Sequence, residues 1–464
     1  MSSPVPIDSK HKWSTCYLSQ VDRNKVGSDI SRSSYQRDYD RIIFSSAFRR
    51  LQNKTQVFPL PGTAFVHNRL THSLEVASVG RSIGTIVGRS LAVKYFDKDS
   101  EDYQFYFYEL SNVIGAACLA HDLGNPAFGH SGEAAISHFF GSFQETPIEG
   151  TKLRDIYADA EWEDLTNFEG NANALRILTQ SFHGKAAYGM GLTQACLAAI
   201  LKYPCESIAT NKRKKHTKKY GFFQSEKAIF NKLVSDLNFI QEGSDPIVYR
   251  RHPFVYLVEA ADDICYNIID MEDAHRLGIL SKETVSQAFL NVIEELNNPT
   301  DDFAKIQLTY QSIGDNNEAI SYLRAKAINT LTLECCRVFL EQEEQIINSE
   351  FDTSLFSEIE SQAKSLVHIE EMSLHQIYRH PRVLEIEVAG FNVMSGLLEM
   401  YLPAVLKEFK SPVDKTIVSL IPSQFRPKDE DTPYLKTMNV LDHISSMTDA
   451  FAVEHYRKLK GIEI

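Results

Sequence analysis

Long segments in which apolar residues recur every three to four positions dominate this sequence. This spacing is typical of α-helices that bury one face, whereas the alternating pattern of a β-strand is scarce. Several of the segments end at helix-stop signals, such as Asn125-Pro126 and Pro204. We therefore predict a mostly α fold, with at most a minor β-hairpin at residues 57–66. The periodic segments are 70–96, 109–123, 172–182, 192–203, 226–241, 253–270, 283–297, 318–345 and 384–409.

Size and composition narrow the class of protein. A chain of 464 residues with 43% hydrophobic residues predicts one large domain with additions, or two to three closely packed domains. The formal charge of −13 argues against binding of nucleic acid by the whole surface.

The cysteines and the apolar segments indicate the compartment. Seven cysteines without a CxxC pair indicate reduced thiols. No apolar run approaches the roughly 20 residues of a membrane helix, and the first residues, MSSPVPIDSKHKW, contain no apolar signal core, so we expect a cytoplasmic protein without membrane contact.

Two segments break the helical pattern. Residues 141–164 are polar and contain Gly and Pro, which predicts a long loop or insertion. Residues 211–219 carry six Lys or Arg side chains in nine positions. Such a run is either a solvated loop or an electrostatic contact to phosphates, including those of single-stranded DNA. The helices from residue 300 onward carry no obvious chemistry and are expected to pack on the rest or to form subunit contacts.

One short stretch, LAHDLGNPAFGHSGEAA at 119–135, places four polar side chains among small and apolar ones. These are His121, Asp122, His130 and Glu133. Burying such groups without partners costs several kcal/mol or shifts their pKa values until they are neutral. The stretch therefore predicts that something bound there compensates for their burial.

Other helices supply further groups of the same kind. His72 lies on an amphipathic segment with Arg69 three residues before it, and Asp262 and Asp263 lie inside another apolar helix. Two imidazoles with two carboxylates form a mixed nitrogen and oxygen ligand set. This set suits Mn²⁺, Fe²⁺, Mg²⁺ or Zn²⁺ in a hydrolytic site and fits poorly with a thiol-rich structural zinc site.

The order His … His-Asp … Asp on separate helices resembles the HD-domain metal-dependent phosphohydrolases. The surrounding motifs narrow the resemblance; they are SSAFRRLQNKTQVFPL, RLTHSLEVASVGR, LAHDLGNPAFGHSGEAAI, NFEGNANALRIL, LKYP, GFFQSE, VEAADDICYNIIDMEDA, SGLLEMY and ISSMTDAFAVEHYRKL. From about residue 35 to 460 these motifs resemble the deoxyguanosine triphosphate triphosphohydrolase (dGTPase) family. This resemblance implies an N-terminal extension at 1–34, an HD-domain helical core at 35–300 and a C-terminal helical region at 301–464 that completes the substrate pocket.

The resemblance also implies the metal ligands. Those positions are His72, His121, Asp122 and one of the two adjacent aspartates. We choose Asp262, because the family uses a Tyr and an Asp four and eight residues further on for the deoxyribose. Counting from Asp262 gives Tyr266 and Asp270, whereas counting from Asp263 gives Asn267 and Met271. The expected ion is Mn²⁺ or Mg²⁺, with Fe²⁺, Co²⁺, Ni²⁺ and Zn²⁺ as further candidates.

In the family, a His and an acid downstream of the HD pair form the reactive pair, which implies His130 and Glu133 here. The implied reaction is attack of water on the α-phosphorus of dGTP, with deoxyguanosine and intact triphosphate as products. Cationic and polar side chains would take up the charge of the triphosphate. The candidates for this task are Arg69, Asn171, Lys202, Tyr203 and Lys219.

Recognition of the nucleoside is also implied by the resemblance. Gln56 and Asp270 would hydrogen-bond near the 3′-hydroxyl, and Tyr266 would occupy the space that a ribose 2′-hydroxyl needs. Guanine would be read by the carboxylate of Glu399 between the apolar side chains of Val57 and Phe391.

Several alternatives remain at this point. The enzyme could accept several dNTPs or need a second nucleotide as activator. The chain could instead be a nucleic-acid-binding scaffold with a degenerate HD site, or a phosphodiesterase for cyclic or alarmone nucleotides. Family members assemble into closed homo-oligomers, so a hexamer or tetramer is expected.

Overall fold

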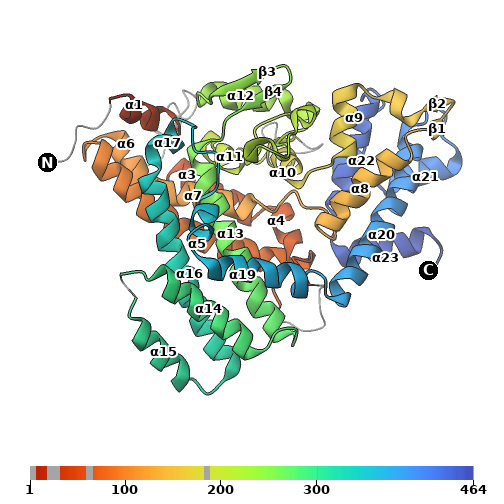
Figure 1. Cartoon of the computed structure of the whole chain (residues 1–464). Coiled ribbons are helices and arrows are strands. Elements are labelled where there is room, and N and C mark those ends of the chain that lie inside the picture. Colours follow the sequence, from red (N-terminus) through yellow and green to blue (C-terminus); the bar gives the residue numbers. More distant parts are fainter. Residues whose placement is uncertain (1–6, 18–31, 59–65, 182–188, 300, 463–464) are drawn as a thin grey trace.

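Helices dominate the computed structural model, which describes residues 7–17, 32–58, 66–181, 189–299 and 301–462 (Figure 1). Within these ranges the strands form only two short antiparallel ribbons, β1–β2 and β3–β4. The prediction of a mostly α fold is therefore confirmed. The hairpin predicted at 57–66 lies largely outside the described residues.

Helices follow one another along the chain with few strands between them. The helices of the first half are α1 (Ile7–Thr15), α3 (Ser34–Ile43), α4 (Ser46–Arg50), α5 (Arg69–Tyr95), α6 (Glu101–Gln104), α7 (Leu110–Ala120), α8 (His130–Ser142), α9 (Asp159–Thr166), α10 (Gly170–Thr179), α11 (Gln194–Ile200) and α12 (Lys227–Asp236). Those of the second half are α13 (Pro253–Arg276), α14 (Lys282–Leu296), α15 (Phe303–Ser312), α16 (Asn316–Glu341), α17 (Glu343–Ile347), α18 (Leu355–Glu360), α19 (Lys364–Met372), α20 (Pro381–Leu406), α21 (Pro412–Leu420), α22 (Pro433–Ser445) and α23 (Asp449–Leu459). The strands are β1 (Pro147–Ile148), β2 (Thr151–Lys152), β3 (Gln241–Ser244) and β4 (Ile247–Tyr249).

The first core is built around α5, α7 and α13, which pack on one another and on α16. Three glycines at a spacing of four residues line the face of α5 that meets α7. A Cβ at Gly80 would lie 2.5 Å from Cys118 Sγ, one at Gly84 would lie 2.9 Å from Ser111 Cα, and one at Gly88 would overlap the Tyr106 carbonyl oxygen. The lack of side chains at these positions allows the two helix backbones to approach closely.

A second core joins segments that are far apart in the sequence. Apolar side chains of α8 and α9 pack with those of α20, α21, α22 and α23, at the right of Figure 1. The helices α14 to α19 pack instead with the first core. The C-terminal region predicted at 301–464 is thus divided between the two cores.

The helix α20 is long and apolar enough to cross a membrane by length and composition alone. However, 56% of its most apolar window is buried inside the molecule, and the helix packs on α8, α22 and α23. Burial of this kind is typical of the central helix of a folded domain.

Both segments that break the helical pattern are folded. Residues 141–164 contain the β1–β2 ribbon and most of α9, with Leu153 and Trp162 buried in the second core. In the basic run, His216 and Lys214 contact Glu242, and His216 is 2% exposed. The interpretation of 211–219 as a freely solvated loop is therefore wrong for part of the run.

Candidate active site

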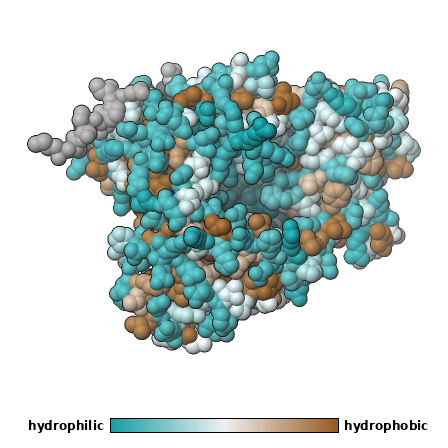
Figure 2. Space-filling model, viewed as in Figure 1, coloured by the Kyte–Doolittle hydropathy of each residue, from teal (hydrophilic) through white to brown (hydrophobic). Residues whose placement is uncertain are grey.

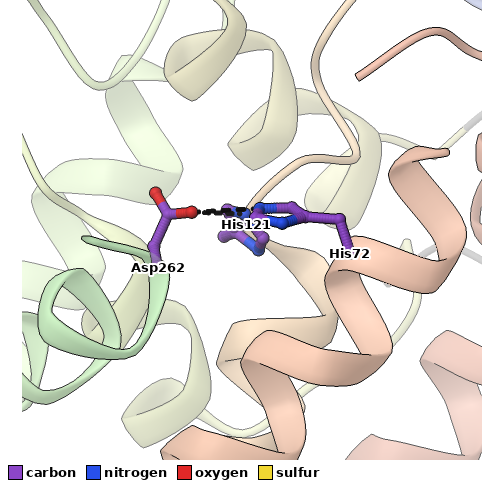
Figure 3. Close-up of side chains that lie close together, drawn as sticks. All are labelled: His72, His121 and Asp262. Carbon is purple, nitrogen blue, oxygen red and sulfur yellow. Dashed lines mark hydrogen bonds and ion pairs between the residues drawn. The ribbon is translucent and has the colours of Figure 1, made fainter. Parts of the chain in front are cut away.

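Three side chains from three helices of the first core meet at one point (Figure 3). His72 lies in the first turn of α5, His121 directly follows α7, and Asp262 lies in the middle of α13. Their ligand atoms all lie within 4.8 Å of one another, and Asp262 Oδ1 is 3.1 Å from His72 Nε2 and 3.4 Å from His121 Nε2. The close packing of α5 on α7 brings the two imidazoles together.

The orientation of His121 fits a bound cation. Its Nδ1–H donates to the carbonyl oxygen of Cys118 at 2.6 Å, so Nε2 is the ring nitrogen left to carry a proton or bind a cation. Among the described residues this buried Nε2 has no hydrogen-bond partner, and it faces the carboxylate of Asp262. A carbonyl that fixes the outer nitrogen of an imidazole is common at metal sites. A ring nitrogen without a hydrogen-bond partner, opposite a carboxylate, is therefore consistent with a divalent ion between them.

The electrostatics of the site also favour positive charge. Burial lowers the pKa of His121, but the carboxylates of Asp122 and Asp262 outweigh this effect and raise that pKa to about 9. Burial would raise the pKa of Asp262, yet His121 and His72 hold it well below its usual range. The carboxylates thus stay ionised and stabilise a cation at the centre of the site.

Asp122 lies beside the three clustered side chains rather than among them. Its Oδ1 is 3.7 Å from His121 Nε2 and accepts a hydrogen bond from Asn125, while its Oδ2 accepts from Arg69 Nη1 at 2.9 Å. Burial would raise the pKa of Asp122, but Arg69 and His121 keep it lowered. Arg69 is itself buried in this ion pair, which the sequence did not predict.

His130 and Glu133 form a hydrogen-bonded pair at the start of α8. His130 Nδ1 lies 3.0 Å from Glu133 Oε2, and Glu133 Oε1 accepts the backbone N–H of Gly170 at 2.9 Å. The imidazole is 81% exposed, whereas the carboxylate is buried. Burial would raise the pKa of Glu133, but the hydrogen bond from His130 and the charge of Lys219 outweigh it and lower that pKa. The pair therefore joins an ionised buried carboxylate to an imidazole that faces solvent.

A cavity of about 500 Å³ connects these groups, which is the size typical of small-molecule sites. Figure 2 shows that this face of the molecule is hollowed near its middle. The cavity brings together most of the residues that the sequence analysis singled out. Those that line it are Gln56, Val57, Arg69, His121, Asp122, His130, Glu133, Asn171, Lys202, Tyr203, Lys219, Asp262 and Tyr266.

Two buried carboxylates of the cavity wall hold the cationic side chains. Glu259 Oε1 is 3.3 Å from Lys202 Nζ, and Glu259 Oε2 accepts from Arg251 at 2.9 Å. Glu169 accepts from Lys219 Nζ at 2.9 Å and from the amide of Asn171 at 2.6 Å. The sequence analysis did not identify either glutamate.

The other end of the cavity is aromatic. The rings of Tyr266 and Tyr378 are stacked with their centroids 5.7 Å apart, and the Tyr378 hydroxyl donates to Asp270 Oδ2 at 2.7 Å. Burial raises the pKa of Asp270 to about 8. Asp270 is not among the lining residues, because Tyr378 lies between it and the cavity. Tyr378 comes from the segment between α19 and α20, where the sequence offered no signal for it.

The two remaining candidates lie on α20. Phe391 lines an adjoining hollow of about 430 Å³ together with His130, Val388 and Glu387. Glu399 lines neither cavity, and its carboxylate lies 3.8 Å from Lys460 Nζ. Glu387 lines both cavities, but the sequence does not distinguish it from the other acids of the helix.

Comparison with known proteins agrees with this arrangement. The HD domain model matches residues 69–193, and the phosphohydrolase-associated domain model matches residues 359–458. A deoxyguanosinetriphosphate triphosphohydrolase-like protein of Synechocystis sp. is 38% identical over 94% of this chain and 95% of its own length. One of Listeria monocytogenes is 34% identical over 96% and 97%. The deoxyguanosinetriphosphate triphosphohydrolase of Cronobacter sakazakii is 30% identical over 92% and 94%.

Proposed function

Because the chain belongs to the deoxyguanosinetriphosphate triphosphohydrolase family of HD-domain phosphohydrolases, we propose that it hydrolyses dGTP to deoxyguanosine and inorganic triphosphate. The observation that carries the proposal is the cluster of His72, His121 and Asp262, because His121 and Asp262 line the same cavity as the His130–Glu133 pair. In this reaction a water oxygen bonds to the α-phosphorus and the bond from that phosphorus to O5′ breaks.

His72, His121 and Asp262 would hold the divalent ion, with Asp122 as the fourth proposed ligand. Bound there, Mn²⁺ or Mg²⁺ would polarise the α-phosphate and lower the pKa of a water molecule. The same mixed donor set can accept Fe²⁺, Co²⁺, Ni²⁺ or Zn²⁺.

The His130–Glu133 pair would move the proton. Glu133 accepts the Nδ1–H of His130, which leaves Nε2 of the exposed imidazole available to reacting groups. In our proposal Nε2 takes a proton from the attacking water and returns one to O5′ as the nucleoside leaves. The hydrogen bond from Gly170 N–H keeps the Glu133 carboxylate in place.

The triphosphate would bind among Arg69, Lys202, Lys219, Asn171 and Tyr203. Glu259 and Glu169 already hold the two lysines at the cavity wall, which reduces the entropy lost when phosphate oxygens bind them. Charge-assisted hydrogen bonds of this type are stronger than neutral ones.

For the nucleoside, we propose that Gln56, Tyr266 and Asp270 recognise the deoxyribose. Asp270 would act through Tyr378, which lines the cavity and donates a hydrogen bond to the Asp270 carboxylate. A site that hydrogen-bonds a substrate hydroxyl discriminates strongly, because its buried polar groups otherwise lack a partner. Val57 and Phe391 would flank the base. Since Glu387 lines the cavity and Glu399 pairs with Lys460, Glu387 is the better candidate for the carboxylate that reads guanine.

The experiment is hydrolysis of each of the four dNTPs, alone and in mixtures, with Mn²⁺ and with Mg²⁺. We expect dGTP to give deoxyguanosine and triphosphate, separated by anion-exchange chromatography. Pyrophosphate or orthophosphate as the primary product would contradict the reaction. Equal rates for several dNTPs, or activity only in mixtures, would instead identify a broader or a nucleotide-activated enzyme.

We also propose a cytoplasmic homo-oligomer, hexamer or tetramer. All seven cysteines are free thiols, as a reducing compartment favours. Light scattering of the purified protein tests the assembly. A monomer at micromolar concentration would contradict it.

A further inference from the structure

Asp449, the first residue of α23, contacts two segments of the cavity at once. Its Oδ2 accepts the backbone N–H of Thr55 at 2.8 Å, and its Oδ1 accepts the backbone N–H of Phe128 at 2.9 Å. Thr55 belongs to the cavity loop, residues 54–58, which carries two of the nucleoside candidates. Phe128 belongs to the catalytic turn, residues 124–129, which leads directly into His130. One carboxylate of the second core thus joins both segments.

The catalytic turn needs such support. Phe128 and Gly129 both have positive φ, 63° and 57°, a conformation that an aromatic residue rarely adopts unless its surroundings hold it. The ring of Phe128 also packs against Gly390 of α20, where a Cβ would lie 2.5 Å from Phe128 Cγ. The direction in which α8 begins, and with it the place of His130, follows from these two backbone angles.

A buried lysine of the cavity loop also contacts the catalytic turn. Lys54, which is 3% exposed, donates from Nζ to the carbonyl oxygen of Asn125 in the catalytic turn and to that of Ser445 at the end of α22. The attraction between Lys54 and Asp449 adds to these hydrogen bonds. The cavity loop, the catalytic turn and the ends of α22 and α23 therefore form one polar junction.

We propose that Asp449 is a positioning residue for the hydrolysis proposed above, on which this inference rests. Its own side chain does not line the cavity and makes no described hydrogen bond to His72, His121 or Asp262. Its carboxylate fixes the catalytic turn, and so His130 and Glu133, relative to the cavity loop. The C-terminal helix α23 thus contributes to turnover through the hydrogen bonds of Asp449 to the backbone N–H groups of Thr55 and Phe128.

The substitution Asp449→Asn tests this role. The amide keeps the shape and one acceptor, but its NH₂ group would face one of the two N–H donors. Displacing a catalytic group by about 1 Å can reduce the rate about 100-fold. We expect kcat for dGTP to fall by about 10- to 100-fold, while the Kd for Mn²⁺ stays at the wild-type value. Asp449→Glu keeps the buried charge near Lys54 and is expected to recover part of the lost kcat.

Amide hydrogen exchange supplies a readout that does not depend on the reaction. In Asp449→Asn, the amides of Thr55 and Phe128 should exchange about tenfold faster or more, while peptides of α5 and α13 keep their protection. Glu454→Gln is the matched control, because this carboxylate lies exposed on the same helix and contacts only Lys458 in the described hydrogen bonds. It should change neither kcat nor exchange.

Two results would overturn the inference. In the first, Asp449→Asn keeps both the wild-type kcat and the wild-type exchange at Thr55 and Phe128. In the second, protection is lost uniformly through α5 and α13, which would assign Asp449 to global folding. If the wild-type protein does not hydrolyse dGTP, the proposed function fails. The exchange rates of the Thr55 and Phe128 amides in Asp449→Asn still report whether Asp449 holds the two segments together.

Discussion

The two helical cores contribute different parts of the site in different ways. The first core brings together the proposed metal ligands His72 on α5, His121 directly after α7 and Asp262 on α13, so the packing of these helices sets their separation. The second core contributes α8, whose first residue is His130, and the position of that residue depends on a turn with positive φ held by contacts from several segments. Metal binding should therefore be separable from turnover, whereas turnover should depend on both cores.

The largest expected effect is that of His121→Ala. Loss of this imidazole leaves two clustered ligands, so the divalent ion and the activity should disappear together. We expect activity to fall by about three orders of magnitude or more, with calorimetry showing no Mn²⁺ binding. His368→Ala, an exposed histidine on α19, is the control and should behave like wild type. Wild-type Mn²⁺ affinity in His121→Ala would contradict the proposal that the clustered side chains of the first core bind the metal.

The next effect is that of Glu133→Gln, which removes the carboxylate partner of His130 without touching the three clustered ligands. We expect kcat to fall by about 100-fold or more while the Kd for Mn²⁺ is unchanged. Glu145→Gln, an exposed carboxylate that pairs with Lys152, should leave kcat unchanged. A parallel loss of metal in Glu133→Gln would show that the two parts of the site are not separable.

A third prediction concerns the connection to the C-terminal helices. Arg176 of α10 is fully buried and pairs with Asp442 of α22 at 2.8 Å and with Glu226 at 2.7 Å. Arg176→Met leaves two buried carboxylates without their cation, so the free energy of unfolding should fall by about 3–5 kcal/mol. Arg337→Met, which breaks a partly exposed pair on α16, should cost less than about 1 kcal/mol. Urea denaturation measures both, and equal effects would contradict the prediction.

The smallest effect is a pH dependence within the first core. Burial lowers the pKa of His67, but Asp273 and Glu75 outweigh it and raise that pKa to about 10. The protonated form is therefore favoured in the folded state. Its contribution to the free energy of unfolding is fully present below the unfolded pKa of about 6.5 and is lost as the pH rises toward 10.

The substitution His67→Gln should accordingly destabilise the protein more at about pH 6 than at about pH 9, as urea denaturation can measure. The difference between the two pH values should be absent in His368→Gln, because that side chain is exposed. A destabilisation by His67→Gln that does not change with pH would show that these ion pairs are not formed in solution.

The sequence predicted the helices well because apolar periodicity reports directly on burial, and it predicted the HD pair because two histidines and two acids in an apolar stretch are unusual. It did not predict Glu169, Glu259, Tyr378 or Glu387. Each of these lies on an element with other residues of its type, and only the packing of distant segments decides which one faces the cavity. For the same reason the sequence could not favour Glu387 over Glu399, about three helical turns away, as the proposed guanine carboxylate.

The glycines of α5 link the spacing of the two clustered histidines to a distant part of the fold. Gly88 follows His72 by 16 residues, about 24 Å along the helix. A side chain at Gly88 would meet the Tyr106 carbonyl oxygen and push the far end of α5 away from Phe105–Glu109, the segment that leads into α7. Since His72 lies in the first turn of α5 and His121 follows α7, a change in the angle between these helices changes the gap between the imidazoles. The separation of the two histidines is thus tied to a residue with no side chain, at the opposite end of a helix.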